Sequence, residues 1–308
     1  MKTPEYVYGP VPSRRLGLSL GVSPIPKKTC NYACIYCQLG RTDHMTNARQ
    51  NFYPLEDILD EVKAVIEGGT EFDVITIVGE GEPTLYADLG DLIRGLKGLS
   101  EKPVAVITNG ALLYDERVQE ALLEADLVLP SLDAAEEGVF KRINRPHGSL
   151  KFDRVIEGLR KFSQKYKGQL WIEIMLVKGI NDDEAALLGF KAMLETLRYD
   201  RLCINTVVRP PAEPEVEAVA PAVMRKAVDI LGGTPIDLLE SEGFHSDIED
   251  DREAVLSIIK RHPMNQFEIE AFLERRGSEE ASGILNALRH DPLVATILYK
   301  GYETFRMK

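Results

Sequence analysis

The sequence is poor in cysteine, in positive charge and in long apolar runs. It has four cysteines among 308 residues, and its 49 aspartates and glutamates outnumber its 37 lysines and arginines, for a net charge of −12. This charge opposes nonspecific adhesion to nucleic acid, because such adhesion depends mainly on neutralising phosphates. No apolar run approaches the roughly 20 residues that a membrane-spanning helix needs, and the first six residues hold no apolar signal-peptide core. We therefore expect a cytoplasmic protein with reduced thiols and no membrane partner.

Three of the four cysteines, Cys30, Cys34 and Cys37, stand within eight residues, and Cys203 lies far downstream. Thiols this close are poorly placed for disulfides, which need a specific separation of the two Cα atoms, but they suit a metal centre. A structural zinc ion needs four ligands, and the fourth would be His44 or Cys203. A 4Fe–4S cubane on three thiolates would instead keep one iron open for a small ligand. A redox dithiol at Cys34 and Cys37 is a further alternative, but it leaves Cys30 unexplained.

Strand and helix patterns alternate from Leu55 to about Leu239. Apolar β runs separated by amphipathic helices imply parallel strands, right-handed crossovers and helices that cover the sheet. The pattern alone does not distinguish an open doubly wound sheet from a closed or partial barrel. The expected strands are 72–78, 104–108, 127–132, 170–177, 202–208 and 236–239, and the expected helices are 55–66, 88–96, 116–123, 152–162, 184–197 and 223–231.

Two of these strands carry a polar residue opposite their apolar face, namely Glu173 in 170–177 and Asn205 in 202–208. A carboxylate in the middle of a strand is costly unless it has a partner or water. Polar residues on one face favour a barrel with a wet interior, into which Glu173 and Asn205 would point. The alternative is that Glu173 faces solvent at an edge of the sheet.

The C-terminal part differs in character from the rest. A connector rich in proline and acidic residues, 210–221, precedes the last helix of the first domain, and 241–250 is polar and typical of a linker. The remaining segments, three short helices and a hairpin, have the layout of a winged helix-turn-helix. The expected elements of this part are helices 252–260, 266–273 and 280–288 and strands 294–299 and 302–307.

The third of these helices, the one that usually contacts DNA, begins with Glu279 and Glu280 and lacks a cluster of lysines or arginines. A packing or protein-binding role is therefore favoured, and DNA is not an expected partner. The expected domains are a core of residues 1–240, a linker of 241–250 and a winged-helix-like domain of 251–308.

The cysteine run resembles the signature of the radical S-adenosylmethionine (radical SAM) superfamily. The spacing is Cys30-x-x-x-Cys34-x-x-Cys37, and the aromatic Tyr36 stands just before the last cysteine. The resemblance extends from roughly Pro12 to Leu239. It implies an α/β fold with a partial (β/α)6 barrel.

Three further motifs resemble those of the superfamily and follow in the matching order. Gly81-Glu82-Pro83 resembles the glycine-glutamate-proline loop, where the family's backbone contacts the SAM amino group, although Glu80 stands where many members have a glycine. Thr108-Asn109-Gly110 resembles the motif that ends the third strand. Ser131-Leu132-Asp133 resembles the fourth-strand motif near the SAM carboxylate and ribose.

The resemblance implies two cofactors, a 4Fe–4S cluster on the three cysteines and SAM on its open iron. In the family, the reduced cluster gives one electron to SAM, which yields methionine and a 5′-deoxyadenosyl radical that abstracts hydrogen from substrate. The protein supplies orientation and excludes water. Glu173 and Asn205 would contact the ribose or the substrate. The full set of residues expected to bind the cofactor is Tyr36, Gly81, Glu82, Asn109, Ser131, Asp133, Glu173 and Asn205.

Structural roles are the alternatives for several of these residues. Tyr36 can belong to the core, and Gly81 can be a turn glycine. Ser131 and Asp133 can cap the following helix.

Three segments, 11–17, 38–42 and 205–211, together resemble an uncharacterised radical SAM subgroup related to the tRNA wyosine-forming synthases. Those synthases share the sequence Gly-Glu-Pro-Thr-Leu-Tyr, found here at Gly81–Tyr86. Those synthases resemble enzymes with a second cluster on additional cysteines, whereas only Cys203 remains here, which argues against wyosine synthesis itself. With no flavodoxin-like domain in the sequence, we expect a separate ferredoxin or flavodoxin as electron donor.

Three arginines stand near the cluster motif, namely Arg14, Arg15 and Arg41. Their guanidinium groups suit an anionic substrate. The alternative is that they are solvated or paired with carboxylates.

The substrate class stays open between RNA and a peptide or protein. One alternative function is an iron–sulfur sensor that binds nucleic acid through the C-terminal domain. Another is a noncatalytic scaffold stabilised by zinc.

Overall fold

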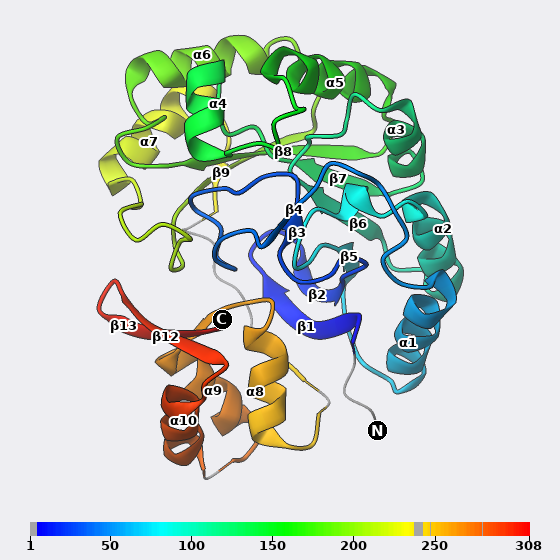
Figure 1. Ribbon diagram of the computed structural model, residues 1–308, viewed down its shortest axis with the longest axis vertical. Coiled ribbons are helices and arrows are strands. Elements are labelled where there is room, and N and C mark those ends of the chain that lie inside the picture. The colour runs from blue at the N-terminus through cyan, green and yellow to red at the C-terminus, as the bar shows by residue number, and fades with distance from the viewer. Residues whose placement is uncertain (1–4, 237–242, 247, 279) are drawn as a thin grey trace.

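A computed structural model describes residues 5–236, 243–246, 248–278 and 280–308. Its centre is an eight-stranded sheet in the order β1-β2-β5-β6-β7-β8-β9-β10 (Figure 1). β1 is antiparallel to β2, and all other neighbours are parallel. The strands are β1 (Val7–Ser13), β2 (Gly17–Val22), β5 (Val74–Ile77), β6 (Val104–Thr108), β7 (Leu127–Pro130), β8 (Gln169–Leu176), β9 (Arg201–Thr206) and β10 (Thr234–Pro235).

Helices form an arc outside this curved sheet (Figure 1). Their apolar stripes make the main core against the outer face of the strands; in α1, for example, Ile58 and Val62 lie one turn apart and are fully buried. The arc is broken between β1 and β10, so the fold is the expected α/β partial barrel. The helices are α1 (Leu55–Glu67), α2 (Leu89–Leu99), α3 (Glu116–Leu122), α4 (Glu137–Ile143), α5 (Phe152–Lys165), α6 (Glu184–Leu194) and α7 (Pro221–Leu231), with a short 3-10 turn at Pro83–Leu85.

Most expected elements are confirmed with ends within three residues, and three differences have physical reasons. The β1–β2 hairpin was not predicted, because β1 contains two prolines and a glycine with φ 90°. The seven-residue α4 is too short to show a helical period. The last expected strand, 236–239, falls mostly on residues outside those described, and β10 lies just before it.

The inner face of the sheet is apolar at the N-terminal ends of its strands. Val74, Ala105, Leu127 and Leu129 form a separate buried cluster there. Loops at the carboxyl ends of the strands therefore surround a part of the interior that is open to a site, as in other parallel α/β folds.

The C-terminal part has its own core, and β1 contributes Tyr8 and Val11 to it. The helices α8, α9 and α10 and the hairpin β12–β13 match the expected elements, and a short strand that was not predicted, β11, pairs with β13. α9 begins with a capping box formed by Asn265 and Glu268. The elements are α8 (Asp251–Ile259), β11 (Met264–Asn265), α9 (Gln266–Arg275), α10 (Ala281–His290), β12 (Val294–Tyr299) and β13 (Tyr302–Met307).

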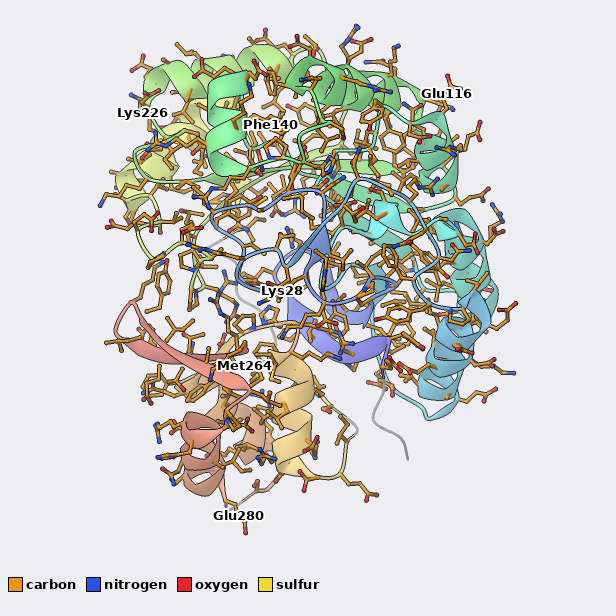
Figure 2. The ribbon with its side chains drawn as sticks, in the orientation of Figure 1. Lys28, Glu116, Phe140, Lys226, Met264 and Glu280 are labelled. Atoms are coloured by element: carbon orange, nitrogen blue, oxygen red, sulfur yellow. The ribbon has the colours of Figure 1, made fainter. Side chains whose placement is uncertain are left out.

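This C-terminal part bridges the break in the arc of helices (Figure 1). α8 packs on β1, while the Tyr299 hydroxyl donates to the Val207 carbonyl just after β9, at 2.8 Å. Arg306 of β13 donates to the carbonyl of Gln38, next to Cys37, at 3.1 Å. In Figure 2, Lys28 lies between the helical arc and Met264 of the C-terminal part. Packing is thus an observed role of this part. Within the described ranges, no helix is both long and apolar enough to cross a membrane.

Candidate functional site

The cysteine loop lies between β2 and α1 and is held by two short strands, β3 (Thr29–Cys30) and β4 (His44–Met45). A Cβ atom on Gly81 would lie 1.8 Å from the Thr29 carbonyl oxygen, so a residue with a side chain would collide with this backbone. The Glu82 amide donates to that same oxygen at 3.1 Å. The loop after β5 therefore sets the position of Cys30.

Two amide side chains approach two of the three thiols. Asn109 Nδ2 lies 3.6 Å from the Cys30 sulfur, and Asn144 Nδ2 lies 3.5 Å from the Cys34 sulfur. Each amide nitrogen also donates to an oxygen, Asn109 to Asn31 Oδ1 at 2.7 Å and Asn144 to Asp133 Oδ2 at 2.7 Å. Donors of this kind stabilise negative charge on cluster thiolates.

Burial raises the pKa of all three thiols, for Cys30 to about 12 and for Cys34 well above its usual range. A redox dithiol requires a lowered pKa, so this environment opposes that alternative. A bound metal supplies the positive charge that makes buried thiolates stable.

The cysteine loop does not offer the donor set of a single zinc ion. Over the described parts of the chain, no group of three or more His, Cys, Asp or Glu side chains is placed to hold one metal ion. His44 is exposed, and Cys203 is buried in β9. A cubane needs a different arrangement of ligands. Each thiolate binds a different iron, so the three sulfurs surround the cluster and need not meet at one metal ion. The loop therefore fits a cluster better than zinc.

Asp133 connects the cysteine loop to β8. It accepts hydrogen bonds from the Tyr36 hydroxyl at 2.6 Å, Asn144 Nδ2 at 2.7 Å and the Met175 amide at 3.2 Å. Burial raises the pKa of Asp133, and the bonds from Tyr36 and Asn144 oppose that rise. The helix-cap alternative for Ser131 and Asp133 is wrong, because Glu136 occupies the N-cap of α4.

The Glu82 side chain is buried and fully engaged. Its carboxylate accepts from the Thr84 amide and hydroxyl, from the Thr108 hydroxyl at 2.6 Å and from the Asn109 amide at 2.8 Å. The carboxylate therefore holds the end of β6 against the loop after β5. Any contact of Glu82 with SAM remains a prediction for its backbone.

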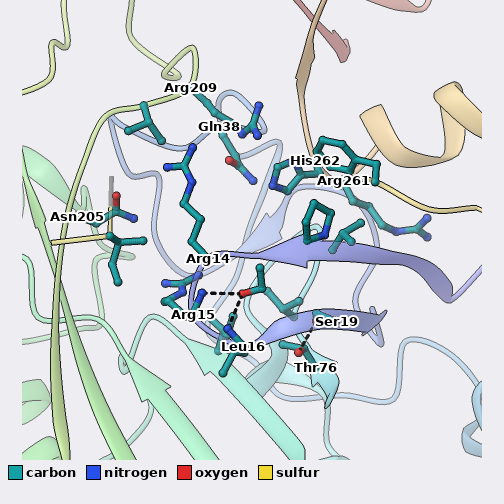
Figure 3. Close-up of a pocket in the computed structure, with 18 of the residues that line it drawn as sticks. Arg14, Arg15, Leu16, Ser19, Gln38, Thr76, Asn205, Arg209, Arg261 and His262 are labelled. Carbon is teal, nitrogen blue, oxygen red and sulfur yellow. Dashed lines mark hydrogen bonds between the residues drawn. The ribbon is translucent and has the colours of Figure 1, made fainter. Parts of the chain in front are cut away.

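A cavity of about 510 Å³ lies inside the barrel, toward the carboxyl ends of the parallel strands (Figure 3). Glu173 and Asn205 line it as predicted, and Glu173 forms an ion pair with Arg15 and lies 3.5 Å from Asn205 Nδ2. The alternative of Glu173 at an exposed edge is therefore wrong. Tyr36 and Cys37 line the same cavity, so it opens onto the cysteine loop.

The predicted cofactor residues lie in three places rather than one. A second cavity of about 20 Å³ has room for roughly one water molecule. Tyr36, Glu173 and Asn205 line the large cavity; Asn109, Ser131 and Asp133 line the small one; Gly81 and Glu82 line neither.

The group of three arginines expected near the cluster is divided. Arg14 and Arg15 line the large cavity, but Arg41 lies outside its lining and binds both oxygens of Glu213, at 3.1 and 2.8 Å. Arg209 and His262 also line the cavity but were not predicted as site residues, because the C-terminal part brings His262 into the site and anchors Arg209 there.

Comparison with known proteins agrees with this geometry. The sequence profile of the Radical SAM superfamily matches residues 25–190, more than half of the chain. The chain belongs to the radical SAM superfamily. Its cofactors are accordingly a 4Fe–4S cluster and SAM, and it is a radical SAM enzyme.

Curated relatives extend the likeness to the whole chain. A UPF0026 protein of Methanocaldococcus jannaschii is 35% identical over 98% of this chain and 95% of that protein. A UPF0026 protein of Helicobacter pylori is 39% identical over 68% of each chain. A protein of Brachyspira hyodysenteriae named GTPase Obg is 41% identical over 72% of this chain. The match covers only 32% of the length of that protein.

Solved structures share the fold at low identity. TYW1 with a lysine-pyruvate adduct bound has a TM-score of 0.53 and 20% identity, over 69% of this chain and 72% of that one. A radical SAM methyltransferase from Sphaerobacter thermophilus has a TM-score of 0.55 and 18% identity, over 71% and 67%. These likenesses support the radical SAM core of the fold.

Proposed function

We propose that Cys30, Cys34 and Cys37 hold one 4Fe–4S cluster that faces the barrel cavity, and that the enzyme abstracts hydrogen from a substrate bound there. When bound and reduced, the cluster supplies the electron that cleaves SAM to methionine and a 5′-deoxyadenosyl radical. The observation that carries this proposal is the position of the loop. Three partly buried thiols lie at the carboxyl ends of the strands, two have amide donors, and Cys37 lines the cavity.

The other residues of the site would position ligands. Glu82 fixes the Asn109 amide, and Asp133 fixes the Tyr36 hydroxyl, so both carboxylates act through their neighbours. Glu173 and Asn205 face the interior from adjacent strands and suit the hydroxyls of a ribose or of the substrate. Asn109 and Ser131, which line the small cavity, and Gly81, in the loop after β5, would contact SAM.

We propose domains of 1–240, 241–250 and 251–308, the last a winged-helix-like module. Its contacts with β1 and the cysteine loop support a role in closing the barrel and excluding water. The sensor alternative is less favoured, because the chain has a net charge of −12 and Arg289 of α10 is paired with Glu303.

The electron donor would be a separate ferredoxin or flavodoxin. The substrate expected from the sequence is RNA or a peptide or protein. Copurification of tRNA after mild anaerobic purification would favour RNA, and transfer of deuterium from a labelled peptide into 5′-deoxyadenosine would favour a peptide.

Anaerobic reconstitution tests the function itself. We expect about four irons per chain, and release of 5′-deoxyadenosine after addition of dithionite and SAM. Stoichiometric zinc in place of iron, with no SAM cleavage, would refute the proposal.

A further inference from the structure

The large cavity is cationic although the chain as a whole is strongly acidic. Five arginines line it, against two glutamates, Glu173 and Glu268. The net charge of the chain is −12, so this concentration of positive charge is local. The lining arginines are Arg14, Arg15, Arg209, Arg261 and Arg275.

Two of these arginines converge on one part of the wall. Arg14 extends from the β1–β2 turn into the cavity, toward Arg209 and Gln38 (Figure 3). Arg209 is fixed in place, because both of its terminal nitrogens bind Glu268 at 3.0 Å and one also binds the Pro263 carbonyl. These three bonds use three of the five N–H donors of the guanidinium and offset part of its charge, so two donors remain, in a fixed orientation, to bind an oxyanion.

His262 adds an unsatisfied polar atom to the same wall. Its Nδ1 is buried and has no hydrogen-bond partner among the residues that the structure describes. Burial, followed by the positive charges of Arg209 and Arg14, holds the pKa of His262 well below its usual value, so the ring is neutral. Buried polar atoms nearly always have a partner, and here a ligand can provide one.

We propose that this wall binds an oxyanion, a phosphate or carboxylate group of a small-molecule substrate, through Arg14, Arg209 and His262. The inference rests on the proposed function, since the bound molecule would be the substrate of the radical reaction. A cavity of about 510 Å³ has the size of a small-ligand site.

A small molecule is favoured over RNA. The C-terminal part covers one side of the cavity through Arg209–Glu268, Arg306–Gln38 and the 3.4 Å ion pair Arg261–Glu80. A polymer that entered from this side would have to break these contacts, and it would also meet the negative charge of the chain.

Calorimetric titration of the anaerobically reconstituted full-length protein tests the inference. The probes are pyrophosphate for phosphate groups, citrate for carboxylates, and bulk tRNA. We expect one of the two small anions to bind at one site per chain, and Arg14→Gln to weaken it at least about tenfold, the loss of one charged hydrogen-bonding partner. The matched control is Arg41→Gln, which removes an arginine outside the cavity and should leave the affinity unchanged.

Several outcomes would overturn the inference: no binding of either small anion, binding of tRNA alone, or equal losses in Arg14→Gln and Arg41→Gln. If Arg14→Gln does not fold, Arg14→Lys keeps the charge but loses the planar fork, and it should still weaken binding while Arg41→Lys does not. The function and the inference fail separately. SAM cleavage without anion binding refutes only the inference, and anion binding without SAM cleavage refutes only the function.

Discussion

The two walls of the barrel cavity are built differently. On the wall of the cysteine loop, the polar groups satisfy one another, as Tyr36 and Asn144 do through Asp133. On the wall of the C-terminal part, the buried Nδ1 of His262 has no partner in the described structure. A network in which every polar group has a partner keeps its geometry without a ligand. A buried polar atom without a partner is stabilised when a ligand provides one. The first wall suits a permanently bound group and the second suits a molecule that comes and goes.

Removal of one cysteine from the wall of the cysteine loop should have the largest effect. In Cys34→Ala, we expect iron content and SAM cleavage to fall to background, because two thiolates do not hold a cubane. Iron analysis and 5′-deoxyadenosine release measure both. Cys203→Ala is the matched control, and it should keep the iron and the activity; loss of iron in this control would show that Cys203 is a ligand.

The next largest effect should come from the carboxylate that supports the cysteine loop. Glu82→Ala leaves the Thr84 and Asn109 amides and the Thr108 hydroxyl without their acceptor. We expect the free energy of unfolding to fall by roughly 3 kcal/mol or more, since each unsatisfied buried donor costs about 1–3 kcal/mol. Urea denaturation measures this. The exposed Glu101→Ala should change stability by about 0.5 kcal/mol at most, and an equal change in both variants would contradict the assigned role of Glu82.

The amide beside Cys34 should have a smaller, electronic effect. A donor to a thiolate favours the reduced cluster, so Asn144→Ala should make the reduction potential more negative. A net hydrogen bond of about 1 kcal/mol corresponds to roughly 40 mV for one electron. Redox titration of the reconstituted protein followed by electron paramagnetic resonance (EPR) measures the shift. An unchanged potential with an intact cluster would show that this contact does not tune the cluster.

The smallest effect should come from a contact far from the cavity, between α8 and the end of α9. Hydrogen bonds from Ser278 and Arg276 lower the pKa of Asp251. Its stabilisation is therefore present above the ordinary carboxyl pKa of about 4 and is lost as the pH falls through the lower pKa of the folded state. Asp251→Asn should cost about 1 kcal/mol or less at pH 7 and nothing at low pH, as measured by urea denaturation at several pH values. A cost that grows as the pH falls would reverse the assigned sign.

The sequence predicted the elements and faces that depend on local pattern. β6 occupies the predicted residues 104–108, both hairpin strands of the C-terminal part are as expected, and the alternation along β8 placed Glu173 on the inner face. The cysteine motif predicts the proposed metal centre, because its spacing is itself the chemical signal.

What the sequence did not provide depends on contacts between distant segments. His262 enters the cavity, and Arg209 is fixed there, only because the C-terminal part docks on the barrel. Arg41 stands near the cluster motif but pairs with Glu213, 172 residues away. Charge and proximity in sequence could not show which arginines face the interior.

EPR of the dithionite-reduced wild-type protein, recorded with and without SAM, tests the central claim most directly. If three cysteines hold a cubane with an open iron at this cavity, we expect a 4Fe–4S signal that changes on addition of SAM and is absent in Cys34→Ala. A cluster signal that is the same with and without SAM, or that survives in Cys34→Ala, would contradict the account.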